Sequence, residues 1–143
     1  MFEVMARLKI RDGELAGFKH QAAEMMRQTR DKDTRTLRYD WFLSADGSEC
    51  EVRESYVDAD ALLEHARNVF EARDTLFRDF AYDHQMTIYG EPSPALEQLM
   101  EQLKGVVPFR RLKLLQGLEV DIEASADSEG ADSDDAERLN TLS

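Results

Sequence analysis

The stretch YDWFLSADGSECEVRESYVDADALLEH, residues 39–65, carries the strongest local signals in the chain. Asp46-Gly47 separates two segments rich in aromatic and β-branched residues, which is typical of a β-hairpin closed by a two-residue type I′ turn. That turn predicts the facing pairs Leu43–Cys50, Trp41–Val52, Tyr39–Glu54 and Leu37–Tyr56. All eight side chains would share one face of the hairpin, and we expect that face to lie under the helices.

The segments around the hairpin complete a β-α-β-β-α-β order. Alternating apolar residues predict a strand, whereas apolar residues at three- and four-residue steps predict a helix. On these criteria we expect a strand over 2–10, a helix over 14–30, a helix from the N-cap Asp58 to about Phe80 with a break near Arg73-Asp74, and a strand over 84–90. The predicted fold class is therefore α+β, with a ferredoxin-like antiparallel sheet.

The C-terminal part of the chain changes in character twice. A short helix is expected from Pro94, and VVPFRRLKLL (106–115) should form an edge strand or an arm because Pro108 cannot donate a hydrogen bond to a sheet. Residues 1–118 form the predicted domain. Residues 119–143 hold nine acidic residues against one arginine, which predicts a disordered acidic tail.

Charge and composition exclude several classes of partner. The formal net charge of the 143 residues is −12, most of it in the tail, so binding to nucleic acid is not expected. There is no apolar run of membrane-spanning length and no signal-peptide pattern, so we expect a cytoplasmic protein without a membrane partner.

No metal site is expected, because His20, His65 and His84 fall on different elements. Cys50 has no partner cysteine and is expected to be a small buried residue, the alternative being a reactive thiol.

His65 and Glu54 are the candidate catalytic residues. His65 borders the apolar stripe of its helix, where an imidazole could take a proton from a phenol or an enolisable ketone. Glu54 lies on the apolar face of the hairpin, so its carboxylate needs a partner, for which Arg7, Arg38 and His65 are candidates. The alternatives are a histidine hydrogen-bonded to a strand carboxylate without catalytic duty, and a structural ion pair at Glu54.

Tyr39, Trp41 and Tyr56 are the candidate substrate-binding residues on the same face. Aromatic residues at strand spacing usually belong to the core, although a planar ligand would find stacking surfaces and hydroxyl donors there. Asn68 lies one helical turn after His65 and could donate a hydrogen bond to a substrate oxygen. The alternative for Asn68 is a solvated position.

Four passages of the chain resemble the antibiotic biosynthesis monooxygenase family. They are MFEVMARLKIRDGELAGFK, TLRYDWFLSADGSECEVRESY, DADALLEHARNV and MTIYGEPSP, all within about residues 1–100. Glu54, Tyr56 and His65, spaced E-x-Y with the histidine nine residues later, are the most family-like residues. The resemblance implies a homodimeric α+β barrel, in which two sheets pack face to face and each protomer keeps its own pocket.

The family contains cofactor-free quinol and anthrone oxygenases as well as heme-degrading enzymes. The heme-degrading members use an Asn on the first strand, a Trp at the end of the third strand and a heme-ligating His late in the second helix. Here the first strand has no Asn, the Trp position is Tyr56, and no histidine lies between His65 and His84. These departures argue against heme degradation.

The resemblance therefore implies a monooxygenase that acts with O₂ on a small aromatic molecule such as a quinol or an anthrone, without metal, flavin or other cofactor. In that scheme His65 is the base, Glu54 orients it, and Tyr39, Trp41 and Tyr56 hold the ring. The main alternative is a non-enzymatic homodimeric module that binds a small hydrophobic metabolite. A third alternative is a scaffold that acts through the acidic tail.

Overall fold

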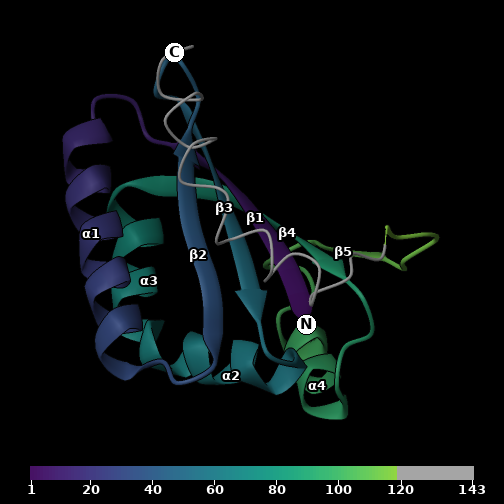
Figure 1. The fold of residues 1–143 in the computed structure, drawn as a ribbon. Helices are drawn as coiled ribbons and strands as arrows, with labels where there is room; N and C mark the ends of the chain where they lie inside the picture. Colours follow the sequence, from purple (N-terminus) through teal and green to yellow (C-terminus); the bar gives the residue numbers. More distant parts are fainter. Residues whose placement is uncertain (119–143) are drawn as a thin grey trace, which may run out of the picture.

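The computed structural model describes residues 1–118, so the predicted acidic tail, residues 119–143, lies outside the described residues. The elements follow in the order β1 (Phe2–Ile10), α1 (Leu15–Lys32), β2 (Thr36–Leu43), β3 (Glu49–Tyr56), α2 (Ala59–Asn68), α3 (Phe70–Asp79), β4 (Ala81–Tyr89), α4 (Pro94–Gln102) and β5 (Phe109–Leu112). Figure 1 shows α1 and α3 side by side against one face of the sheet. The predicted α+β class is confirmed.

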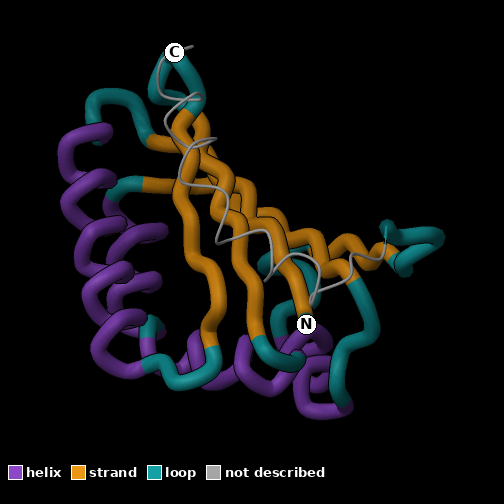
Figure 2. The backbone as a smooth tube through the Cα atoms, viewed as in Figure 1, coloured by secondary structure: helices purple, strands orange, loops and turns teal. Residues whose placement is uncertain are grey.

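The sheet has the strand order β2-β3-β1-β4-β5. The first four strands pair antiparallel in the ferredoxin-like order, as predicted. Short β5 pairs parallel to β4 and lies at the sheet edge, immediately after Pro108, which agrees with the predicted edge strand. Figure 2 shows the strands as one layer with the helices packed beside it.

The hairpin keeps the predicted register over most of its length. Leu43 pairs with Cys50, Trp41 with Val52, and Tyr39 with Glu54. The predicted pair of Leu37 with Tyr56 is wrong, because Thr36 takes that place and Leu37 is the extra residue of a bulge. The side chain of Leu37 is consequently exposed.

The predicted type I′ turn is also wrong. A type I′ turn needs positive φ at both central residues, and of the two only Gly47 has one, at +73°. Ser44 instead accepts a bond from Gly47 N at 3.0 Å and donates to Glu49 O at 2.9 Å, which gives a four-residue loop. The Asp46 carboxylate accepts bonds from Ser44 and Ser48, and this local network replaces the tight turn without changing the pairing of the strands.

The second crossover consists of two helices. Asp58 caps α2 as predicted, with its carboxylate accepting a bond from Ala61 N at 2.9 Å. The break between the helices lies at Val69, four residues before the predicted position. Val69 is itself buried, and the break lets α2 pack against α1 and α4 while α3 runs along α1.

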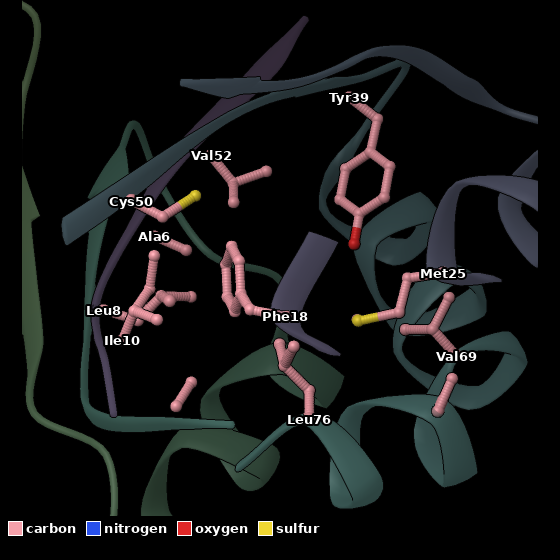
Figure 3. Packing of buried hydrophobic residues seen from close by; sticks show 12 residues of the cluster. Ala6, Leu8, Ile10, Phe18, Met25, Tyr39, Cys50, Val52, Val69 and Leu76 are labelled. Atoms are coloured by element: carbon pink, nitrogen blue, oxygen red, sulfur yellow. The ribbon is translucent and has the colours of Figure 1, made fainter. Parts of the chain in front are cut away.

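The core lies between the helices and the predicted face of the hairpin. In Figure 3, Phe18 of α1 lies between strand residue Val52 and Leu76 of α3, and the Tyr39 hydroxyl points toward Met25. The expectation that the Tyr39–Trp41 face lies under the helices is confirmed. The opposite face of the sheet leaves large apolar side chains exposed, among them Phe42 at 55%, Val57 at 49% and Tyr89 at 41%.

Among the helices within residues 1–118, none combines the length and the apolar character needed to cross a membrane.

Candidate functional site

A cavity of about 70 Å³ lies between the sheet and the helices. Its wall is mostly apolar and includes residues from all five strands and from every helix. The polar side chains on the wall are few: Tyr39, Trp41, Glu54, His65, Arg73 and His84. The structure therefore brings four of the six predicted site residues, Tyr39, Trp41, Glu54 and His65, to one cavity.

His65 is held by a carboxylate that was not predicted from the sequence. Its Nδ1 lies 2.8 Å from Oδ2 of Asp33, the residue that ends α1. Both side chains are almost fully buried, with 6% of His65 and 3% of Asp33 exposed. A carboxylate can only accept, so Nδ1 carries the hydrogen, and the neutral form of the ring has its lone pair at Nε2.

Asp33 is itself fixed by two further donors. Asn68 Nδ2 donates to Oδ1 at 2.8 Å, and Thr36 Oγ1 donates to Oδ2 at 2.6 Å. Burial alone would raise the pKa of Asp33, but the bonds from His65, Asn68 and Thr36 outweigh burial and lower it. Asp33 is therefore ionised at neutral pH. Asn68, predicted to contact substrate, binds Asp33 with its side-chain amide and is absent from the cavity wall.

Glu54 occupies the other side of the imidazole. Its Oε1 accepts a hydrogen bond from the Tyr56 hydroxyl and lies 3.9 Å from Nε2 of His65. The hydrogen-bonded carboxylate of His65 is thus Asp33. His65, one of the three candidate partners of Glu54, lies within ion-pair distance of it but forms no hydrogen bond with it. Arg7 and Arg38, the other predicted partners of Glu54, pair with Glu51 and Asp40 instead. Burial raises the pKa of Glu54, opposed only in part by His65, Tyr56 and Arg73.

The aromatic residues surround the imidazole on the sheet side. Tyr39 meets the His65 ring edge-on at 4.6 Å between centroids, and Tyr56 lies at 5.7 Å. Burial raises the pKa of both phenols well above their usual value, so each remains a hydroxyl. Trp41 Nε1 is buried and has no hydrogen-bond partner among residues 1–118. A ligand acceptor reaching this indole would satisfy it.

A second histidine, His84, lies on the wall of the cavity. The β4 strand bulges opposite Leu8, where Asp83 adopts a positive φ of 55°, and such bulges re-aim neighbouring side chains. His84, which with Asp83 forms the bulge, lies on the cavity wall and stacks on Phe77 with ring centroids 4.5 Å apart. Burial, reinforced by the charge of Arg73, lowers the pKa of His84 to about 4, so the ring is neutral at pH 7.

Two other sequence features have structural outcomes. Cys50 is 1% exposed, as expected, and burial raises the pKa of its thiol to about 11. The reactive-thiol alternative requires a thiolate, which this environment disfavours. Within the described part of the chain, no three His, Cys, Asp or Glu side chains come together in a way that could hold a metal ion.

Comparison with solved structures places the chain in a known fold. MupZ from Pseudomonas fluorescens matches with a TM-score of 0.66 and 24% identity, over 85% of this chain and 95% of MupZ. Rv0793 from Mycobacterium tuberculosis matches at 0.55 and 25%, over 66% and 97%. A structure described as an antibiotic biosynthesis monooxygenase matches at 0.57 and 18%, over 66% and 100%. The chain has the antibiotic biosynthesis monooxygenase fold.

These matches confirm the resemblance expected from the hairpin and its flanking segments. The antibiotic biosynthesis monooxygenase fold accounts for the β-α-β-β-α-β core of this chain, and the match to MupZ extends over a larger share of it. Neither a family model nor a curated protein sequence matches the chain.

Proposed function

We propose that the protein is a cofactor-independent monooxygenase that deprotonates a small electron-rich aromatic substrate and lets the resulting anion react with O₂. The observation that carries the proposal is the fixed ring of His65. Ionised, buried Asp33 holds Nδ1–H at 2.8 Å, so the basic Nε2 belongs to the side of the ring that faces Glu54 and the cavity. A general base needs this combination of a defined tautomer and an oriented ring.

The residues around His65 can stabilise both charges that form in such a reaction, the imidazolium and the substrate anion. Removal of a proton by Nε2 makes an imidazolium, which the carboxylate of Asp33 stabilises without moving. The substrate becomes an enolate or a phenolate, and the unpartnered Trp41 Nε1–H is available to donate to its oxygen. Burial raises the pKa of Glu54, which lessens the repulsion between its carboxyl group and that anion.

The reaction balances without a further reductant. The deprotonated carbon gives one electron to O₂, and the two radicals combine to a peroxide that takes its proton from the imidazolium. Loss of the second C–H proton and of hydroxide then gives a carbonyl and water. For a methylene substrate, R₂CH₂ and O₂ are converted into R₂C=O and H₂O, so O₂ supplies the oxidising equivalents.

The size of the cavity restricts the substrate. An engineered cavity of about 150 Å³ in another protein accommodates benzene. The cavity beside His65 is about 70 Å³, so a substrate ring has to displace side chains such as Phe77 or extend outward past them. A small aromatic whose reactive carbon alone reaches His65 fits this space best.

Oxygen consumption with a panel of quinols and anthrones tests the proposal. We expect uptake that His65→Gln abolishes, because the glutamine amide can still donate to Asp33 while offering no base. His20→Gln is the matched control, since His20 lies exposed on α1. Uptake that persists in His65→Gln would contradict the assigned base. Absence of uptake across the panel would favour the non-enzymatic binding module.

We also propose that two copies pair through the open face of the sheet. Phe42, Val57 and Tyr89 expose large apolar surfaces there, on the side away from the helices. The helices cover only the other face of the sheet, so nothing within residues 1–118 shields these side chains from water. Two sheets packed face to face would remove these side chains from water and leave the cavity of each protomer intact.

A further inference from the structure

The cavity beside His65 adjoins a larger hollow of about 290 Å³ on the protein surface. The walls of both are formed in part by the same four residues, Arg73, Phe77, His84 and Leu103. The outer hollow therefore lies next to the inner cavity, with the Phe77–His84 stack between them. A ligand too large for the inner cavity would occupy both and pass Arg73.

Arg73 differs from the other arginines in the part of the chain that the structure describes. It is half-buried, and its guanidinium has no carboxylate within 4 Å and no side-chain hydrogen bond among residues 1–118. Arg35, the other half-buried arginine of that region, pairs with Asp58 and Glu64. Burial lowers the pKa of Arg73, and the nearby charges of Asp74 and Glu54 offset this desolvation only in part.

The charges around Arg73 leave it available to an external anion. No neighbouring acid of residues 1–118 lies within 4 Å of its guanidinium: Asp83 lies 3.4 Å from Lys9, and Asp74 lies 3.9 Å from Arg78. Glu54, on the wall of the inner cavity, acts on Arg73 from a longer distance and accepts its hydrogen bond from Tyr56. His84 is neutral at pH 7. The guanidinium of Arg73 instead lies 5.8 Å from the ring centroid of Phe70, at the wall of the outer hollow.

We propose that Arg73 binds a carboxylate on the substrate, which makes the substrate an aromatic acid. This inference rests on the proposed function for the identity of the ligand as a substrate, although the binding itself does not require turnover. A planar guanidinium pairs with a carboxylate through two parallel hydrogen bonds. The apolar residues of the hollow, Phe70, Phe77, Leu103 and Val107, suit the carbon skeleton that joins the carboxylate to the reacting ring.

A carboxylate fits better than a phosphate group. Arg11, the second arginine of the outer hollow, donates to the carbonyl oxygen of Phe77 at 3.0 Å and lies over the ring of Tyr82. One available guanidinium beside mainly apolar side chains matches a single negative charge. A phosphate dianion would need further donors.

Binding of two matched probes tests the proposal. The probes are 3-phenylpropionate and the uncharged 3-phenylpropanol, titrated by calorimetry and by the fluorescence of Trp41, which is the single tryptophan of the chain and lines the cavity. We expect the wild-type protein to bind the acid at least about tenfold more tightly than the alcohol, the size expected of a charge-assisted hydrogen bond. Arg73→Gln should abolish this preference, and Arg73→Lys should retain part of it.

Arg67→Gln is the control, because Arg67 is exposed on α2 and lies outside both cavities. It should leave the preference for the acid unchanged. Equal affinity for the two probes in the wild-type protein, no binding of either, or a preference that survives Arg73→Gln would overturn the proposal. Since neither probe is oxidised, these outcomes are independent of whether quinols or anthrones are turned over.

Discussion

His65 and Asp33 form a buried pair in which Nδ1 and Oδ2 lie 2.8 Å apart, although 32 residues separate them in the sequence. The pair joins the end of α1 to the last turn of α2, next to the hairpin. Asn68 and Thr36 complete the shell around the carboxylate. The orientation of the imidazole is therefore determined by α1, α2 and β2 together.

We expect Asp33→Asn to lower the free energy of unfolding at neutral pH by about 1.5–3 kcal/mol, because it weakens a charge-assisted hydrogen bond in a buried site. Chemical denaturation measures the loss. The matched control is Asp31→Asn, which removes only an exposed pair with Arg27 and should cost less than about 0.5 kcal/mol. Equal effects of the two substitutions would contradict the structural role of Asp33.

At acidic pH, the wild type should no longer be more stable than Asp33→Asn. The pKa of Asp33 in the folded protein lies below its ordinary value of 3.8, so its contribution is complete above that value and is lost as the pH falls through the folded pKa. The stability difference between the wild type and Asp33→Asn should shrink in unfolding experiments at progressively lower pH. A difference that stays constant into strong acid would show that the pair acts without its charge.

Glu54→Gln should have the opposite pH dependence. The folded-state pKa of Glu54 lies above its ordinary value of 4.5, so the wild type loses stability as the pH rises from that value toward the raised pKa. Glutamine keeps an acceptor for Tyr56 and carries no charge. The free energy of unfolding of the variant should therefore rise relative to that of the wild type between acidic and neutral pH. Glu51→Gln, on the exposed face of β3, should show no such gain in the same denaturation series.

Association through the open sheet face predicts a particle of twice 16.4 kDa in light scattering after size exclusion. Phe42→Glu should dissociate it, because a charge would have to be buried in the interface. Phe70→Glu makes the same chemical change at an exposed position on the wall of the outer hollow and should leave the mass unchanged. A monomeric wild type, or dissociation by both variants, would rule out this interface.

The fold could be predicted largely from local patterns in the sequence, and the errors of that prediction have local causes. Alternation and the Asp46-Gly47 signal were sufficient for the register of the hairpin, because an error of one residue would have exposed its apolar face. Leu37 was misplaced because a bulge leaves no mark in a pattern of apolar residues. The helix break was misplaced because it depends on how α2 and α3 pack, and Val69 looks like any helical core residue.

The site was predictable in part. Glu54 and His65 could be predicted as candidate catalytic residues because each is an ionisable residue in a pattern of apolar ones. Asp33 was overlooked because it lies in the polar run RDKDTR, where the sequence alone does not reveal which acid is buried. One signal was present: Asp33 follows the buried residues Met25 and Thr29 at four-residue steps, so it continues the inward stripe of α1.

The position of Asp33 at the end of an 18-residue helix has a consequence for the divergence of related sequences. One residue inserted into or deleted from α1 would turn Asp33 by about 100° and shift it by about 1.5 Å, which would separate it from His65. Extra residues in the exposed loop after Leu43 would leave both side chains in place. Relatives that keep the pair should therefore vary in length at the hairpin loop and remain constant in length between Phe18 and Asp33.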